Sequence, residues 1–277
     1  MNLGMAIYQE FYGLQEEPFN VTSDPNFLFF SQHHKEAFSH FLYGIKERKG
    51  FLQLTGEIGS GKTTLCRAIL DTLDKKTKTA FILNPNLSAS QLLKAIVTDF
   101  GITTKGHTRM ELMTALNQFL IHQLTEGANV VLIIDEAQNL SPSVLEQVRM
   151  ISNLETPKKK LIQIALVGQP ELRQKLEDPT LRQLRQRIGV RYHILPLGKD
   201  EVGQYIRHRL HVAGSNGRIG FPLKTVDQIY HYSKGVPRLI NMVCDKCLLA
   251  GYVYETHDIT PDITKRCIQE LENPSSS

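Results

Sequence analysis

The chain has 277 residues, of which 41% are hydrophobic and 22% charged, with a formal net charge of +4. This is an ordinary water-soluble composition with enough apolar residues for a large buried core. The small charge excess permits contact with nucleic acid or an anionic membrane surface but requires neither. Apolar runs such as "VVLII" are too short to span a bilayer, the amino terminus has no leader pattern, and the four cysteines lack framework spacing. We therefore expect a cytoplasmic chain in a reducing compartment.

Strand-like apolar runs alternate with helical periods over the first two-thirds of the chain. Strands are predicted at 50–56, 79–84, 129–135, 161–168 and 190–197. Helices are predicted at 63–73, 88–100, about 110–125 and 141–155, with start signals at Ser88, Ser141 and Pro142. This alternation predicts a doubly wound α/β sheet.

The strand signal stops near residue 198, and the remainder predicts a small all-helical second domain. Its four helical segments are 199–214, 223–235, 236–254 and 260–272. The tail "NPSSS" is expected to be a disordered end.

The segment "GEIGSGKTT" (56–64) lies between the first predicted strand and a helix, and it has the pattern of a phosphate-binding loop. Glycines allow backbone N–H groups to approach a triphosphate closely, and a helix amino terminus behind them favours negative charge. Lys62 is expected on the β- and γ-phosphates and the Thr63 hydroxyl on Mg²⁺. The residues expected to bind the nucleotide are Gly56, Glu57, Ile58, Gly59, Ser60, Gly61, Lys62, Thr63 and Thr64.

An acidic pair, Asp135-Glu136, follows the apolar strand "VVLII". We expect Asp135 to hold Mg²⁺ and Glu136 to be the base that polarises the attacking water. Acidic pairs at strand ends are also common as solvated loop residues. Their combination with the glycine loop favours nucleotide hydrolysis.

Three further residues are candidates for contact with the γ-phosphate. Gln169 follows the fourth strand, where it would touch the γ-phosphate or the water, although a plain turn glutamine is the alternative. Arg187, with Arg185 behind it, is the candidate for an arginine finger that reaches a neighbouring subunit. Most arginines of "LRQLRQRIGVRYH" are expected to form a solvated helix face. Arg238 of "GVPRLIN" would clamp the phosphate from the helical domain.

Three other features favour structural interpretations. Cys244 and Cys247 resemble half a zinc site, but no second pair follows, so buried helix cysteines are expected. His33 and His34 have no partner motif and are expected at the surface. The lysines of 157–160 could meet DNA phosphates, but a solvated turn is favoured.

With these motifs placed, the chain resembles the AAA+ ATPases of the ExeA/GspA family, named for general secretion pathway protein A. The resemblance runs almost end to end and includes the aromatic lead-in at 8–38, "DEAQNL", "GQPEL" and "GVPR". It implies a P-loop core with a five-stranded parallel sheet, followed by a C-terminal helical lid. The implied division is a lead-in and first core helix at 1–48, the core at 49–197, the lid at 198–271 and a tail at 272–277.

The resemblance also assigns roles to single residues. Lys62 and Thr63 belong to the first nucleotide motif, and Asp135 and Glu136 to the second. Gln169 becomes the first sensor, Arg238 the lid sensor, and an arginine of "LRQRI" the finger. The aromatic segment from Tyr12 to Phe19 would lie near the adenine, with lid residues such as Ile206.

Family members in secretion often continue into a transmembrane helix and a periplasmic domain, whereas this sequence stops at Ser277. The biological process therefore stays open between two alternatives. One is an oligomeric, ATP-driven assembly factor acting on inner-membrane secretion or envelope proteins. The other is a regulator of transposition of the TnsC/TniB type, whose ATP-bound ring or filament coats DNA. The cofactors implied in both cases are ATP and Mg²⁺.

Overall fold

The computed structural model describes residues 7–83, 86–157 and 159–273. The chain divides into two compact units. An α/β unit comprises residues 32–57 and 65–194, and a helical unit comprises residues 1–31, 58–64 and 195–277. This division differs from the expected one, since residues 1–31 group with the helical segments and not with the sheet.

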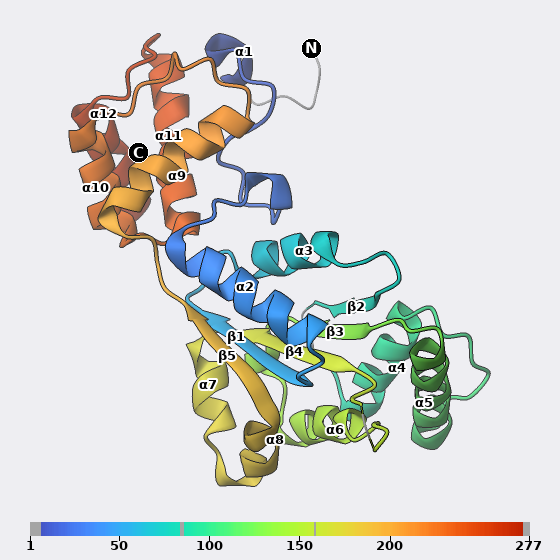
Figure 1. The fold of residues 1–277 in the computed structure, drawn as a ribbon. Coiled ribbons are helices and arrows are strands. Elements are labelled where there is room, and N and C mark those ends of the chain that lie inside the picture. Colours follow the sequence, from blue (N-terminus) through green and yellow to red (C-terminus); the bar gives the residue numbers. More distant parts are fainter. Residues whose placement is uncertain (1–6, 84–85, 158, 274–277) are drawn as a thin grey trace. The chain divides into compact units, whose positions relative to one another are not determined.

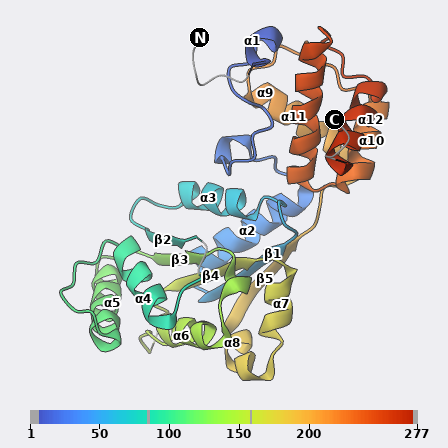
Figure 2. The same cartoon turned by 180° about the vertical axis from the view of Figure 1, so that it is seen from behind.

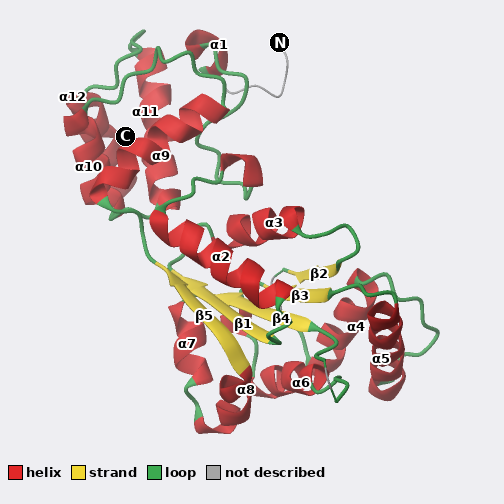
Figure 3. Ribbon diagram, in the orientation of Figure 1, coloured by secondary structure: helices red, strands yellow, loops and turns green. Residues whose placement is uncertain are grey.

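The α/β unit is built on a five-stranded sheet in which every neighbouring pair of strands is parallel. The strand order is β2-β3-β4-β1-β5, so the fourth strand in the chain lies between the first and the third (Figure 3). All residues of β1, β3 and β4 are buried, as the continuous apolar runs predict. The predicted five-stranded parallel sheet is confirmed. The strands are β1 Phe51–Gly56, β2 Lys78–Ile82, β3 Val130–Ile134, β4 Gln163–Gly168 and β5 Ile188–Ile194.

Helices cover both faces of this sheet (Figures 1 and 2). Helices α2 and α3 lie over one face and α6, α7 and α8 over the other, while α4 lies near β2 and α5 packs against α4. Ser88 and Ser141 are N-caps whose side chains accept backbone hydrogen bonds, and Pro142 opens α6, as the sequence predicts. The helices are α2 Gln32–Lys46, α3 Lys62–Thr72, α4 Ala89–Asp99, α5 Arg109–Thr125, α6 Pro142–Ser152, α7 Pro170–Leu176 and α8 Arg182–Arg187, with short 3-10 turns η2 Ala137–Asn139 and η3 Pro179–Leu181.

The helical unit contains the four helices that the sequence predicts after residue 198. They pack around one apolar core in which Cys244 and Cys247 are fully buried, which confirms their structural interpretation. The unit also contains a short first helix and a 3-10 turn. Its elements are α1 Gln9–Tyr12, η1 Pro25–Phe27, α9 Lys199–Val212, α10 Leu223–Ser233, α11 Pro237–Val253 and α12 Pro261–Glu272.

The amino-terminal segment is an integral part of this helical core. The Tyr8 hydroxyl donates a hydrogen bond to the Asp245 carboxylate, and burial, reinforced by that carboxylate, raises the pKa of Tyr8. The Tyr12 hydroxyl donates to the backbone oxygen of Leu248 at 3.0 Å, and burial raises the pKa of Tyr12 to about 12. Both tyrosines therefore stay protonated donors at neutral pH and tie α1 to α11. The guanidinium of Arg209 adds hydrogen bonds to two backbone oxygens of the same segment.

Within the described ranges, no helix combines the length and apolarity needed to cross a bilayer. The last residues of the chain, 274–277, where a disordered tail is expected, lie outside the described residues.

Gly235, in the turn between α10 and α11, is fixed by two constraints. Its φ of +79° lies in the left-handed region, and a Cβ there would lie 2.0 Å from the backbone oxygen of Leu197. The same pair of residues is joined by a hydrogen bond from the Leu197 N–H to the Gly235 oxygen at 2.9 Å. The "GVPR" glycine is therefore required by backbone geometry, whatever else that motif does.

We predict that Gly235→Ala lowers the free energy of unfolding of the protein by about 2–4 kcal/mol, combining left-handed strain with a backbone clash. Gly217→Ala is the matched control, since Gly217 has a similar φ of +75° and open space around its Cβ position. Gly217→Ala should lower the free energy of unfolding by at most about 1 kcal/mol. Urea unfolding followed by circular dichroism measures both, and equal effects would contradict the role of the Leu197 contact.

Candidate functional site

The carboxyl ends of three neighbouring strands meet at one edge of the sheet. Asp135 and Glu136 follow β3, Gln169 follows β4, and Gly56 is the last residue of β1. Since β4 lies between β3 and β1 and all three run in the same direction, the strand end at which the glycine loop starts shares this edge with the acidic pair, with the end of β4 between them. This edge is where open α/β sheets place their ligands.

The acidic pair sits in a tight turn. Asp135 is almost fully buried, and its Oδ1 accepts the Glu136 N–H at 2.9 Å. The Asp135 N–H donates to the Ile82 oxygen at 2.9 Å, which extends the β2–β3 pairing by one residue. Glu136 has φ 52° and ψ 35°, a left-handed conformation that costs a non-glycine residue about 1 kcal/mol or more. The chain thus turns sharply at the residue whose carboxylate is the candidate base.

Two glutamine amides hold one oxygen of the Glu136 carboxylate. Glu136 Oε2 accepts hydrogen bonds from Gln138 Nε2 at 2.5 Å and from Gln169 Nε2 at 3.2 Å. The other end of the Gln138 amide, Oε1, accepts the backbone N–H of Gln169 at 3.1 Å. The structure therefore brings together Glu136 and Gln169 and adds Gln138, for which the sequence indicates no role.

The turn that carries these residues is braced from α7. Lys175 Nζ donates to the backbone oxygens of Gln138 and of Leu140, the latter at 2.8 Å. At the end of β4, a Cβ on Gly168 would lie only 2.5 Å from Gln138 Oε1, so the close approach of this side chain requires the glycine. The acidic turn and the start of α7 are thereby fixed to one another.

The glycine loop has the backbone conformations that a phosphate-binding loop requires. Gly59 and Gly61 have φ values of +75° and +90°, and helix α3 begins at Lys62, as the motif predicts. Lys62 and Ser60 are buried, with 5% and 1% of their surface exposed. Residues 58–64 group with the helical unit, whereas Gly56 and Glu57 group with the sheet.

Within the helical unit, the first residues of α11 lie against this loop. The Arg238 N–H donates to the Gly59 oxygen at 3.2 Å, and a Cβ on Gly59 would lie 2.3 Å from the Arg238 Cβ. The Arg238 side chain is exposed. The predicted lid arginine and the predicted phosphate loop are therefore neighbours.

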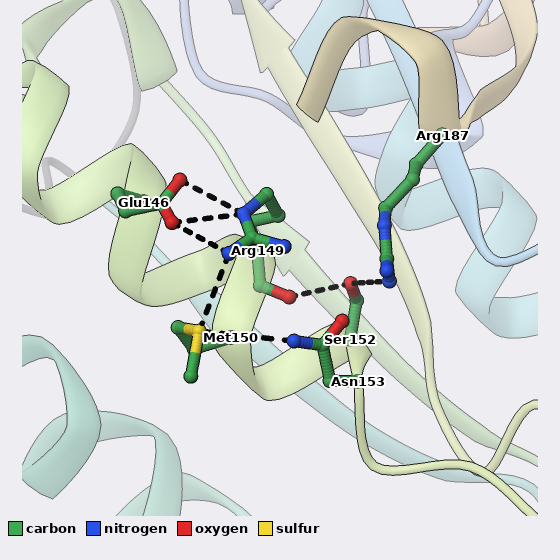
Figure 4. A network of polar contacts seen from close by, with 6 residues as sticks. All are labelled: Glu146, Arg149, Met150, Ser152, Asn153 and Arg187. Atoms are coloured by element: carbon green, nitrogen blue, oxygen red, sulfur yellow. Dashed lines mark hydrogen bonds and ion pairs between the residues drawn. The ribbon is translucent and has the colours of Figure 1, made fainter. Parts of the chain in front are cut away.

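Arg187 lies at the opposite, amino-terminal edge of the sheet, immediately before β5. Its side chain is half-buried and donates from Nη1 to Ser152 Oγ at 3.3 Å (Figure 4). In the same network Arg149 donates to Glu146, and this contact holds the pKa of Glu146 below its usual range. Arg187 and Glu136 therefore lie at opposite edges of the sheet.

Arg185, the second candidate for the finger, has a different environment. It lines a cavity of about 420 Å³ beside β5, together with Arg173 and Arg191. With Glu177 as the acidic residue of the lining, the three arginines leave an excess of positive charge around this cavity.

Two expectations concern aromatic and histidine residues. Tyr12, Phe19 and Ile206 are each at most 2% exposed, and all three pack in the core of the helical unit.

His34 is also buried, so the expectation of a surface position is wrong for this residue. Helix α2 turns it inward, whereas His33 remains partly exposed.

Comparison with known proteins agrees with this architecture. The family model described as an AAA domain matches residues 45–176. General secretion pathway protein A of Aeromonas hydrophila is 44% identical over 254 residues, which is 91% of this chain. The chain spans 46% of that relative's own length.

Solved structures show the same fold at low sequence identity. The Aeropyrum pernix ORC2 protein in its ADPNP-ADP complexes matches 94% of this chain and 74% of its own, with a TM-score of 0.70 and 16% identity. Drosophila ORC bound to DNA matches 98% of this chain and 67% of its own, with a TM-score of 0.72 and 14% identity. The RuvB Holliday junction branch migration motor of Thermotoga maritima matches 88% of this chain and 70% of its own, with a TM-score of 0.61 and 20% identity.

Proposed function

Because this chain belongs to the AAA+ ATPase family and is related to general secretion pathway protein A, we propose that it binds ATP and hydrolyses it to ADP and phosphate. One observation carries the proposal: Gly56, the strand end at which the glycine loop starts, and the acidic pair, Asp135 and Glu136, lie at the same edge of a parallel sheet. Phosphoryl transfer requires positioning and electrostatic stabilisation more than covalent chemistry, and these are the groups that supply both.

Each residue of the site has a role in this reaction. The backbone N–H groups of 56–64 and the Lys62 ammonium bind the phosphates. Glu136 takes a proton from water, the water oxygen bonds to the γ-phosphorus, and the bond to the bridging oxygen breaks with its electrons left on ADP. Gln169 orients the reacting groups, and Arg238 binds the γ-phosphate from the helical unit.

The residues present fit magnesium by the chemistry of their donors. The Thr63 hydroxyl and the Asp135 carboxylate are hard oxygen ligands of the kind Mg²⁺ prefers, and we propose that they hold it. When bound, the ion would neutralise charge on the phosphate oxygens.

We further propose that hydrolysis drives assembly or remodelling within a secretion or cell-envelope system, in an oligomer of this chain. This rests on the name of the relative, general secretion pathway protein A. The partners would be copies of the chain itself and inner-membrane proteins of such a system, met from the cytoplasmic side.

We predict that Lys62→Ala abolishes ATP binding, because it removes the cation from the phosphates, while Glu136→Gln keeps ATP affinity but lowers turnover at least about a hundredfold. Binding of a fluorescent ATP analogue and release of phosphate measure the two effects separately. Wild-type turnover by Glu136→Gln would show that Glu136 is not the base.

We predict that the active site is completed in trans, so specific activity rises with protein concentration. Arg187→Ala should keep ATP affinity and lose about a thousandfold or more in turnover. Mixing it with Lys62→Ala should restore part of the activity, because some interfaces then pair an intact pocket with an intact finger. If the mixture co-assembles and stays inactive, Arg187 is not the finger, and the same mixing experiment with Arg185→Ala tests the next candidate.

The DNA-coating alternative stays a prediction from sequence. Lys160, one of the lysines of the 157–160 turn, is paired with Glu155 in the structure. Filter binding to duplex DNA with and without ATP separates the alternatives: ATP-dependent, salt-sensitive binding would favour the regulator, and absence of binding at low salt would count against it.

A further inference from the structure

The Gln138 side chain is the link between the acidic turn and the start of α7. Its Oε1 accepts the backbone N–H of Gln169 at 3.1 Å, and its Nε2 donates to Glu136 Oε2 at 2.5 Å. A backbone N–H can only donate, so the oxygen of the Gln138 amide must face Gln169 and the nitrogen must face Glu136. The orientation of this amide is therefore determined by its partners.

The two oxygens of the Glu136 carboxylate are unlike. Oε2 accepts from both glutamines, whereas Oε1 accepts from neither. The backbone on either side is also restrained, since Glu136 has a positive φ and Lys175 holds the Gln138 carbonyl. A carboxylate fixed by one oxygen offers the other in a defined direction.

We infer that Gln138 is a positioning residue for hydrolysis: it holds Glu136 by Oε2 and so presents Oε1 to the attacking water. The inference rests on the proposed ATP hydrolysis. As a positioning residue, Gln138 acts on the reaction through the Glu136 carboxylate. Without Gln138, Gln169 would hold Oε2 with a single, longer hydrogen bond of 3.2 Å.

The first test is Gln138→Met, which keeps the length of the side chain and removes both its donor and its acceptor. We expect kcat to fall about 10- to 100-fold, while KM and the affinity for a fluorescent ATP analogue change less than about twofold. Gln174→Met is the matched control, the same change at an exposed position of α7, and should leave kcat unchanged.

The second test repeats Gln138→Met in the Glu136→Gln background. Since Gln138 acts through the Glu136 carboxylate, it should lower the residual rate there by less than about twofold. A structural role would reduce activity in both backgrounds. Should Gln138→Met fail to fold, Gln138→Glu replaces it, because Glu keeps the acceptor for the Gln169 N–H and loses the donor to Glu136.

The outcomes separate this inference from the proposed function. Absence of ATP hydrolysis by the wild type would overturn both. Wild-type hydrolysis that depends on Glu136, with normal kcat in Gln138→Met, would overturn the positioning role alone. A raised kcat would also overturn it, because Gln138 would then hold Glu136 in an unproductive position.

Discussion

The direction of the strands is the constraint on which the rest of the α/β unit depends. β1, β3 and β4 are buried along their whole length, so a polar side chain within them must be hydrogen-bonded inside the unit, as Gln163 is to the Gly50 N–H. Side chains that must reach a ligand are therefore favoured where these strands end, and a parallel sheet brings those ends to a single edge. The strand order decides which ends are neighbours, and β4 between β1 and β3 places Gln169 between the loop start and the acidic pair.

The chain must turn sharply where it leaves the strands at this edge of the sheet, and positive φ values occur in these turns. Glycine meets the need at 59 and 61, but position 136 must carry a carboxylate and adopts positive φ with a full side chain. Strain of this kind persists when surrounding contacts determine the conformation. The Asp135 carboxylate on the Glu136 N–H and the Lys175 ammonium on the Gln138 and Leu140 oxygens are such contacts.

Much of the fold could be predicted from local sequence signals, and the rest could not for a physical reason. Buried strands appear in the sequence as continuous apolar runs. The Ser88 and Ser141 side chains accept backbone hydrogen bonds from residues only three positions later, so these helix starts can also be predicted from a short stretch of sequence. The Tyr8–Asp245 contact joins residues 237 positions apart, and no local pattern indicates that the lead-in belongs to the helical unit. No local pattern indicates the contact of Arg187 either, because its partner Ser152 belongs to another helix, 35 positions away. Gln138 belongs to the motif "DEAQNL", but only the geometry of the turn shows that its amide contacts both Glu136 and Gln169.

The chemical nature of the groups around Glu136 is itself informative. A lysine beside the carboxylate would form an ion pair and compete with the proton that a base must accept. Neutral amides orient the carboxylate by directional hydrogen bonds without cancelling its charge. Lys175, a cation of α7, is bound instead to the backbone oxygens of Gln138 and Leu140, which stabilises the turn. In the described acidic turn, the Lys175 cation thus braces the backbone, while two neutral amides orient the Glu136 carboxylate.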